Sequence, residues 1–102
     1  MSLEHELRAL REGIKCLTEE IIRLAWRRIN LTIEVGKIKK TYNLPIEDES
    51  VEKDLENETL KLCTVEGINR EFALKILRLL IDESKRFQNL LYEKEDSVSL
   101  SK

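Results

Sequence analysis

The sequence has little of what several common protein classes require. Its 102 residues include one proline, three glycines, two cysteines and one histidine. So few turn residues argue against a turn-rich β fold, and the composition excludes collagen and flexible linkers. No apolar run approaches the roughly 18–20 residues that a membrane-spanning helix needs. The chain is therefore expected to form one small domain with a thin core.

The few cysteine and histidine residues also argue against metal and redox chemistry. Cys16 and Cys63 lack metal-type spacing, so we expect both to be reduced and buried in a cytoplasmic protein. Charges begin at the fourth residue, so no secretory signal is expected. His5 has no Cys or His neighbour, which argues against a metal site or a Ser-His-Asp triad. We predict no metal and no cofactor.

The charges nearly balance overall but are unevenly placed. The formal net charge is −2, yet residues 23–40 carry six basic side chains against one acidic, and residues 47–58 carry seven acidic against one basic. The two segments can face each other, be solvated, or form a cationic pocket for a small anion. The overall balance argues against a dedicated nucleic-acid-binding protein, and we expect no membrane partner.

Apolar spacing predicts three helices, over about 3–41, 49–64 and 69–94. Pro45 falls in the first connection and Gly67 in the second, with Asp48 or Ser50 and then Asn69 as N-caps. We expect a single all-α domain over 1–94 and a mobile tail over 95–102. A seam of eleven positions, spaced alternately by four and three, follows the first helix, and its one non-apolar member is Arg28. The seam consists of Leu3, Leu7, Leu10, Ile14, Leu17, Ile21, Leu24, Arg28, Leu31, Val35 and Ile38.

The length of the first helix predicts a dimer. About 38 residues of helix span roughly 57 Å, whereas a compact domain of this size has a radius of gyration of about 13 Å. The seam must then be covered by something else, most simply a second copy in a homodimer. A hairpin-like adaptor that binds a different partner is the alternative.

Polar residues interrupt the apolar faces of all three helices, as in a site built within a helical bundle. Arg28 either snorkels at the seam edge or faces a cavity for a carboxylate or phosphate. Arg11 and Arg28 lie roughly 26 Å apart along one helix, so only an antiparallel pair of chains brings them together. The other candidates are Lys39, Asp48, Glu52, Ser84 and Gln88.

These residues resemble the all-helical chorismate mutases over about 7–91. The matching segments are Ala9-Leu-Arg-Glu-Gly-Ile-Lys, Arg27-Arg28, Ile33-Glu-Val-Gly-Lys-Ile-Lys39, Pro45-Ile-Glu-Asp48, Glu52 and Ile81-Asp-Glu-Ser84-Lys-Arg-Phe-Gln88. The resemblance implies an intertwined homodimer with two shared sites, which rearranges chorismate to prephenate on the route to phenylalanine and tyrosine. It also implies that Arg11 and Arg28 bind substrate carboxylates with help from Ser84. Lys39 and Gln88 would contact the ether oxygen. Glu52, with the Asp48 region, would hold the ring hydroxyl.

One position departs from this resemblance. The family usually has an arginine just before the matching glutamate, and this chain has Val51 before Glu52. Lys53 lies about 200° around the helix from Val51, so it is a poor replacement. Two alternatives therefore stay open: a lyase that removes pyruvate from isochorismate on the same scaffold, and a non-catalytic helical dimer. Within 102 residues no fused dehydratase, dehydrogenase or synthase domain is expected.

Overall fold

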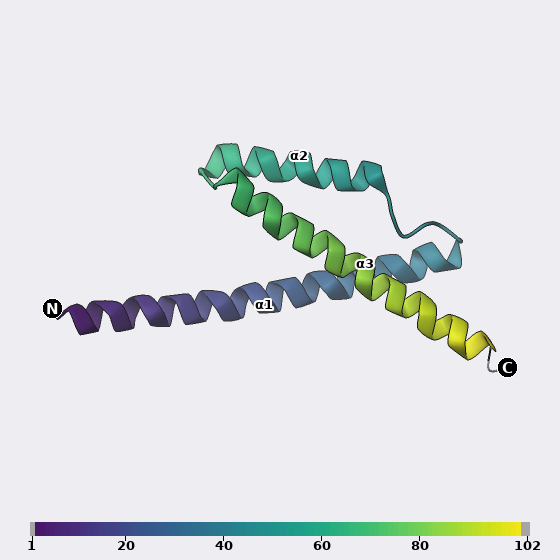
Figure 1. Cartoon of the computed structure of the whole chain (residues 1–102), viewed down its shortest axis with the longest axis horizontal. Coiled ribbons are helices and arrows are strands. Elements are labelled where there is room, and N and C mark those ends of the chain that lie inside the picture. Colours follow the sequence, from purple (N-terminus) through teal and green to yellow (C-terminus); the bar gives the residue numbers. More distant parts are fainter. Residues whose placement is uncertain (1, 101–102) are drawn as a thin grey trace.

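The computed structural model describes residues 2–100, and side chains over 2–93. It contains α1 (Leu3–Thr41), α2 (Glu49–Glu66) and α3 (Arg70–Leu100), with no strand in the described range (Figure 1). The expected all-α chain of three helices is confirmed. None of the helices, over the residues described, has the length and apolar character that crossing a membrane takes.

The helix ends follow from local chemistry. Ser2 caps α1 by accepting a hydrogen bond from the His5 amide. Of the two predicted caps for α2, the structure selects Asp48, whose carboxylate accepts hydrogen bonds from the amides of Ser50 and Val51. Gly67 ends α2 with a φ of 67°, a left-handed conformation that glycine adopts without steric cost. The Asn69 side chain then accepts from the Phe72 amide at 2.8 Å, as predicted for a cap.

The chain is elongated because its helices differ in length and direction. In Figure 1, α2 and α3 form a hairpin, α3 crosses the C-terminal half of α1, and the N-terminal half of α1 projects away from both. The radius of gyration is 18.8 Å and the longest dimension is 68 Å. A compact domain of about 100 residues would have a radius near 13 Å. Among the described residues, none from α2 or α3 packs against the N-terminal half of α1.

The residues of α1 that are buried against α3 lie beside the predicted seam rather than on it. Ile29 and Gly36 are the buried residues of α1, and Leu77, Ile81 and Gln88 are buried on α3. The apolar residues of the seam are exposed, at 65% for Leu10, 63% for Ile14 and 64% for Ile21. Burying an exposed leucine or isoleucine contributes about 1.5–3 kcal/mol, so a row of them is a strong drive for association. The seam is thus left available to a second chain.

Two predictions about individual segments need correction. Cys63 is buried as expected, but Cys16 is exposed because it lies on the projecting half of α1. Helix α3 continues to Leu100, beyond the predicted end at 94. That residues 95–102 form a mobile tail stays a prediction. Residues 101–102 lie outside the described range.

Candidate active site

Six of the seven predicted site residues line one cavity of about 190 Å³ where α1, the start of α2 and α3 meet. Its wall includes four residues of α1 with alternating spacings of four and three, so one face of that helix forms it. Apolar side chains such as Val35, Val51 and Leu55 complete the wall. The six predicted residues that line it are Arg28, Lys39, Asp48, Glu52, Ser84 and Gln88.

Arg28 links α1 to α3 through uncharged oxygens. Its Nη1 atom donates to Ser84 Oγ at 2.6 Å and to the Leu80 carbonyl at 3.1 Å. Burial lowers the pKa of the guanidinium below its ordinary value. Both of these acceptors are uncharged, so an anionic ligand would stabilise the partly buried cation. A guanidinium can bind a carboxylate through two parallel hydrogen bonds.

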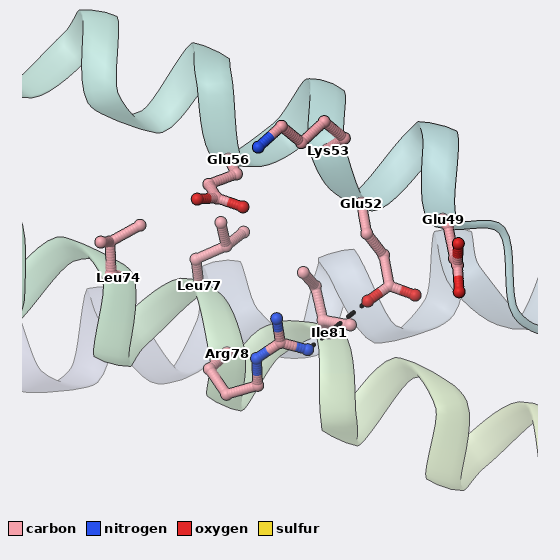
Figure 2. Close-up of a pocket in the computed structure, with 8 residues that line it drawn as sticks. All are labelled: Glu49, Glu52, Lys53, Glu56, Leu74, Leu77, Arg78 and Ile81. Atoms are coloured by element: carbon pink, nitrogen blue, oxygen red, sulfur yellow. Dashed lines mark hydrogen bonds and ion pairs between the residues drawn. The ribbon is translucent and has the colours of Figure 1, made fainter.

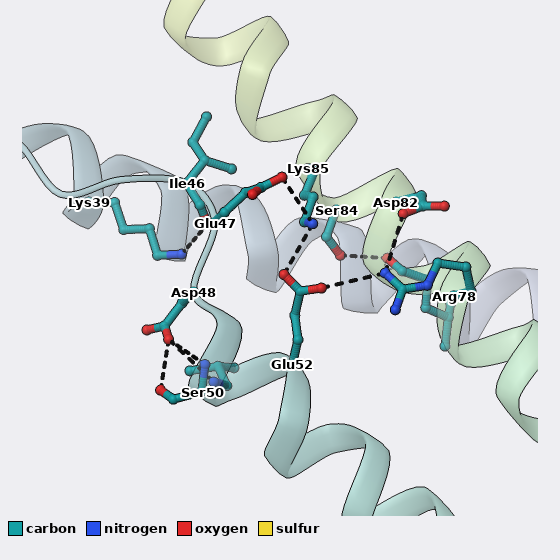
Figure 3. Close-up of polar contacts among 12 residues, drawn as sticks. Lys39, Ile46, Glu47, Asp48, Ser50, Glu52, Arg78, Asp82, Ser84 and Lys85 are labelled. Atoms are coloured by element: carbon teal, nitrogen blue, oxygen red, sulfur yellow. Dashed lines mark hydrogen bonds and ion pairs between the residues drawn. The ribbon is translucent and has the colours of Figure 1, made fainter.

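Lys39 and Asp48 lie at the end of the cavity nearest the first connection. Lys39 Nζ donates to the Ile46 carbonyl at 2.7 Å, which holds the ammonium at the wall (Figure 3). The Ser50 hydroxyl, and then the Val51 amide, lower the pKa of the Asp48 carboxyl, with a further contribution from the charge of Lys39. Asp48 thus has a structural role as the α2 cap and is also one of the residues that line the cavity.

Glu52 is held between two cations from α3. Its Oε2 lies 3.1 Å from Lys85 Nζ and its Oε1 lies 3.4 Å from Arg78 Nη1 (Figure 3). Lys85 also pairs with Glu47 at 3.3 Å. The hydrogen bond from Lys85 is the main reason that the pKa of the Glu52 carboxyl is lowered. Glu52 therefore stays ionised at neutral pH and can accept a hydrogen bond from a hydroxyl group.

Gln88 is fixed by a close approach to α1. It is 5% exposed, and its Nε2 donates to the Thr32 carbonyl at 2.7 Å. A Cβ atom on Gly36 would lie 3.0 Å from Gln88 Cγ, so only glycine fits there without a shift. This close contact between α1 and α3 sets the position of the Gln88 amide.

Arg11 is the predicted site residue that one chain does not bring to the cavity. It is exposed on the projecting half of α1, beside Leu7, Arg8 and Glu12. Its separation from Arg28 along one straight helix prevents both from touching one small ligand within a chain. Participation of Arg11 requires a second copy.

A second hollow, of about 360 Å³, lies between α2 and α3 on the other side of Glu52 (Figure 2). Glu49, Glu52 and Glu56 line it, with Lys53 and Arg78 as the cations. The cavity instead has Arg28, Lys39 and Lys85 against Asp48 and Glu52, which leaves one net positive charge. An anionic ligand is thus favoured in the cavity and disfavoured in the hollow.

Sequence reasoning missed Lys85 and Arg78 as partners of Glu52. Lys85 follows Ser84 directly and lies four residues after Ile81, so it shares the face that carries Ser84 and Gln88. That spacing could have identified Lys85. Arg78 could not be found in this way, because its contact depends on the angle between α2 and α3. Among the residues whose side chains are described, no group of three or more metal-ligating side chains is positioned to hold an ion.

Comparisons with known proteins identify the family of this chain. Residues 10–89 match the family model described as chorismate mutase type II. The bifunctional chorismate mutase/prephenate dehydratase of Escherichia coli K12 is 31% identical over 93 residues, which are 91% of this chain and 24% of that protein. The chorismate mutase of Methanocaldococcus jannaschii is 28% identical over 88 residues, 86% of this chain and 89% of that protein.

The bifunctional enzyme of Shigella flexneri matches at the same 31% identity and the same coverage. The chain thus spans about a quarter of the length of the bifunctional relatives but most of the archaeal one. The family match runs from Leu10 to the residue after Gln88, so it includes all of α2 and the parts of α1 and α3 that line the cavity. This chain belongs to the chorismate mutase type II family.

Proposed function

We propose that the chain catalyses the [3,3] rearrangement of chorismate to prephenate, in which a C–O bond breaks and a C–C bond forms within one molecule. The observation that carries the proposal is that Arg28, Lys39, Asp48, Glu52, Ser84 and Gln88 line one cavity. Such a reaction needs no nucleophile or proton shuttle. It needs a flexible dicarboxylate held in a reactive conformer, together with donors directed at the growing negative charge.

The cavity offers a group for each of these tasks. Arg28, steadied by Ser84, would bind one substrate carboxylate. Lys39 and Gln88 are donors on one side of the cavity, and we assign them to the ether oxygen of the breaking bond. The ionised Glu52 carboxylate would accept the hydrogen bond of the ring hydroxyl, with Asp48 nearby.

The complete site would require a homodimer in which two α1 helices pack antiparallel along their exposed seams. Exposure of Leu10, Ile14 and Ile21 on the projecting half of α1 supports this arrangement. Arg11 of one chain would then approach the cavity of the other, and two equivalent sites would follow from the two-fold axis. The added guanidinium would raise the net charge of the cavity to +2, which matches a dicarboxylate.

The reaction would place the protein on the route to phenylalanine and tyrosine, in the cytoplasm, where free thiols such as Cys16 and Cys63 persist. The rearrangement itself uses no cofactor. Substrate binding by Arg28, Lys39 and Glu52 suits a small dicarboxylate rather than a nucleic acid, since the net charge of the chain is −2.

The test is to mix the purified protein with chorismate and follow its ultraviolet absorbance while prephenate is assayed. Loss of chorismate with equal formation of prephenate supports the proposal. No change, or loss without prephenate, contradicts it. A parallel reaction with isochorismate and a pyruvate assay tests the lyase alternative, and Arg28→Ala serves as the matched site variant.

A further inference from the structure

Lys85 lies on the cavity wall, although the substrate contacts assigned above do not include it. It projects from the face of α3 that carries Ile81, Ser84 and Gln88, all of which line the cavity. Its side chain is 24% exposed, against 59% for Arg78 and 75% for Lys75 of the same helix. Lys85 is therefore the best-shielded of these three cations on α3.

The contacts of Lys85 fix one carboxylate of the site. Its Nζ atom bridges Glu52, at 3.1 Å, and Glu47, at 3.3 Å (Figure 3). The Glu47 side chain is 71% exposed and water competes for it, whereas Glu52 is 22% exposed. The pair with Glu52 is thus the stronger of the two and sets which way the Glu52 carboxylate faces.

Helix α2 brings no cation of its own to the cavity. The residue before Glu52 is Val51, which lines the cavity, while Lys53 lines the hollow on the other side. Without Lys85, the cations Arg28 and Lys39 would face the carboxylates Asp48 and Glu52 with no net charge. With Arg11 of a second chain, the cavity would then offer a dianion one net positive charge instead of two, and Glu52 would keep only its pair with Arg78.

We infer that Lys85 is a positioning residue that holds Glu52 and supplies the positive charge which α2 lacks, so that the cavity binds its dianionic substrate. This inference rests on the proposed function. Because the charge of Lys85 acts on the bound substrate and on the transition state alike, it lowers KM and leaves kcat nearly unchanged. That split separates Lys85 from the donors assigned to the ether oxygen.

The test compares kcat and KM for chorismate in four variants and the unaltered protein. Lys85→Met keeps the length of the side chain and removes its charge, so KM rises about tenfold while kcat stays within about threefold. Lys85→Arg keeps the charge, so its KM stays near that of the unaltered protein. Lys75→Met removes an exposed cation from the same helix and leaves both constants unchanged.

The fourth variant moves the charge to α2. Val51→Arg in the Lys85→Met background places a guanidinium on the same cavity wall, so KM returns toward that of the unaltered protein. A merely structural role of Lys85 would not be rescued from another helix. Thermal unfolding of each variant at one protein concentration shows whether it is folded.

Three results would overturn the inference. They are an unchanged KM in Lys85→Met, a fall of kcat at constant KM, and a KM in Lys85→Arg as high as in Lys85→Met. If Lys85→Met does not fold, two other variants test the inference. Lys85→Arg must keep the KM of the unaltered protein, and Val51→Arg without a second substitution must lower KM. Absence of prephenate with the unaltered protein overturns the proposed function and this inference with it, whereas normal turnover with an unchanged Lys85→Met overturns this inference alone.

Discussion

Replacing Gly36 by alanine tests whether the contact between α1 and α3 sets the catalytic geometry. The new Cβ would lie 3.0 Å from Gln88 Cγ, whereas carbon atoms at their optimal separation are about 3.5–4.0 Å apart. Gln88 is 5% exposed and has little room to turn away. It must therefore give way by a few tenths of an ångström, which strains its hydrogen bond to the Thr32 carbonyl, now 2.7 Å long.

Two opposing effects determine the stability of Gly36→Ala. Alanine favours a helix interior over glycine by about 0.8–1.0 kcal/mol, and overpacking a tight contact costs about 1–3 kcal/mol. The free energy of unfolding should therefore fall by about 0–2 kcal/mol. Misplacing a catalytic group by 1 Å can cost about 100-fold, so a shift of a few tenths of an ångström should lower kcat by about 3- to 10-fold.

Gly13→Ala is the matched control on the same helix. A Cβ at Gly13 would meet nothing within 4 Å in one chain, so this variant gains up to about 1 kcal/mol and keeps its activity. Urea unfolding at fixed protein concentration, the rate of chorismate loss and the mass in solution are measured for both variants. The reasoning is refuted if the two variants are equally active and equally stabilised.

Three further predictions concern other parts of the molecule. Lys39→Ala should reduce kcat by about 100- to 1,000-fold while the dimer stays folded, because a transition-state donor is lost. Lys37→Ala, which removes an exposed lysine, is the control and should leave kcat unchanged. Wild-type turnover in Lys39→Ala would exclude the role assigned to Lys39. Lys85 lowers the pKa of Glu52 in the folded protein. The pair therefore stabilises the fold fully above the ordinary carboxyl pKa near 4.5, and this stabilisation is lost as the pH falls through the lowered pKa of Glu52. Unfolding measured between pH 6 and pH 3 should thus show a smaller loss of stability in Glu52→Gln, and equal losses would contradict the pairing. Ile21→Glu, on the exposed seam, should raise the dimer dissociation constant by at least about tenfold, whereas an unchanged dissociation constant measured by sedimentation would place the interface elsewhere.

The helices and their ends were predictable because local chemistry determines them. Apolar spacing identified α1, α2 and α3, and the caps at Asp48 and Asn69 follow from side chains that can accept amide hydrogens. The end of α3 was placed too early, at 94. No proline or glycine lies between Glu95 and Leu100 to end the helix. The prediction ended at 94 because the apolar spacing ends there, but that spacing indicates packing against other helices rather than helix formation itself.

The site was predictable residue by residue, but its contacts were not. Periodicity singled out Arg28 and Ser84 as exceptions on apolar faces, and the structure joins them at 2.6 Å. Which cation would hold Glu52 depends on how α2 lies against α3, and the spacing within one helix carries no such information. The exposure of Cys16 was missed for a similar reason, since burial along α1 depends on which helices reach it.

A hybrid-dimer experiment tests the shared site most directly. Arg11→Ala and Arg28→Ala each disable both sites of their own homodimer, and the two proteins are then mixed, unfolded and refolded together. If each site takes Arg28 from one chain and Arg11 from the other, each hybrid dimer has one intact site, and statistical mixing restores about a quarter of the unaltered activity. A mixture that forms hybrids, as shown by the mass of differently tagged chains, yet stays as inactive as its parents would contradict a site built from two chains.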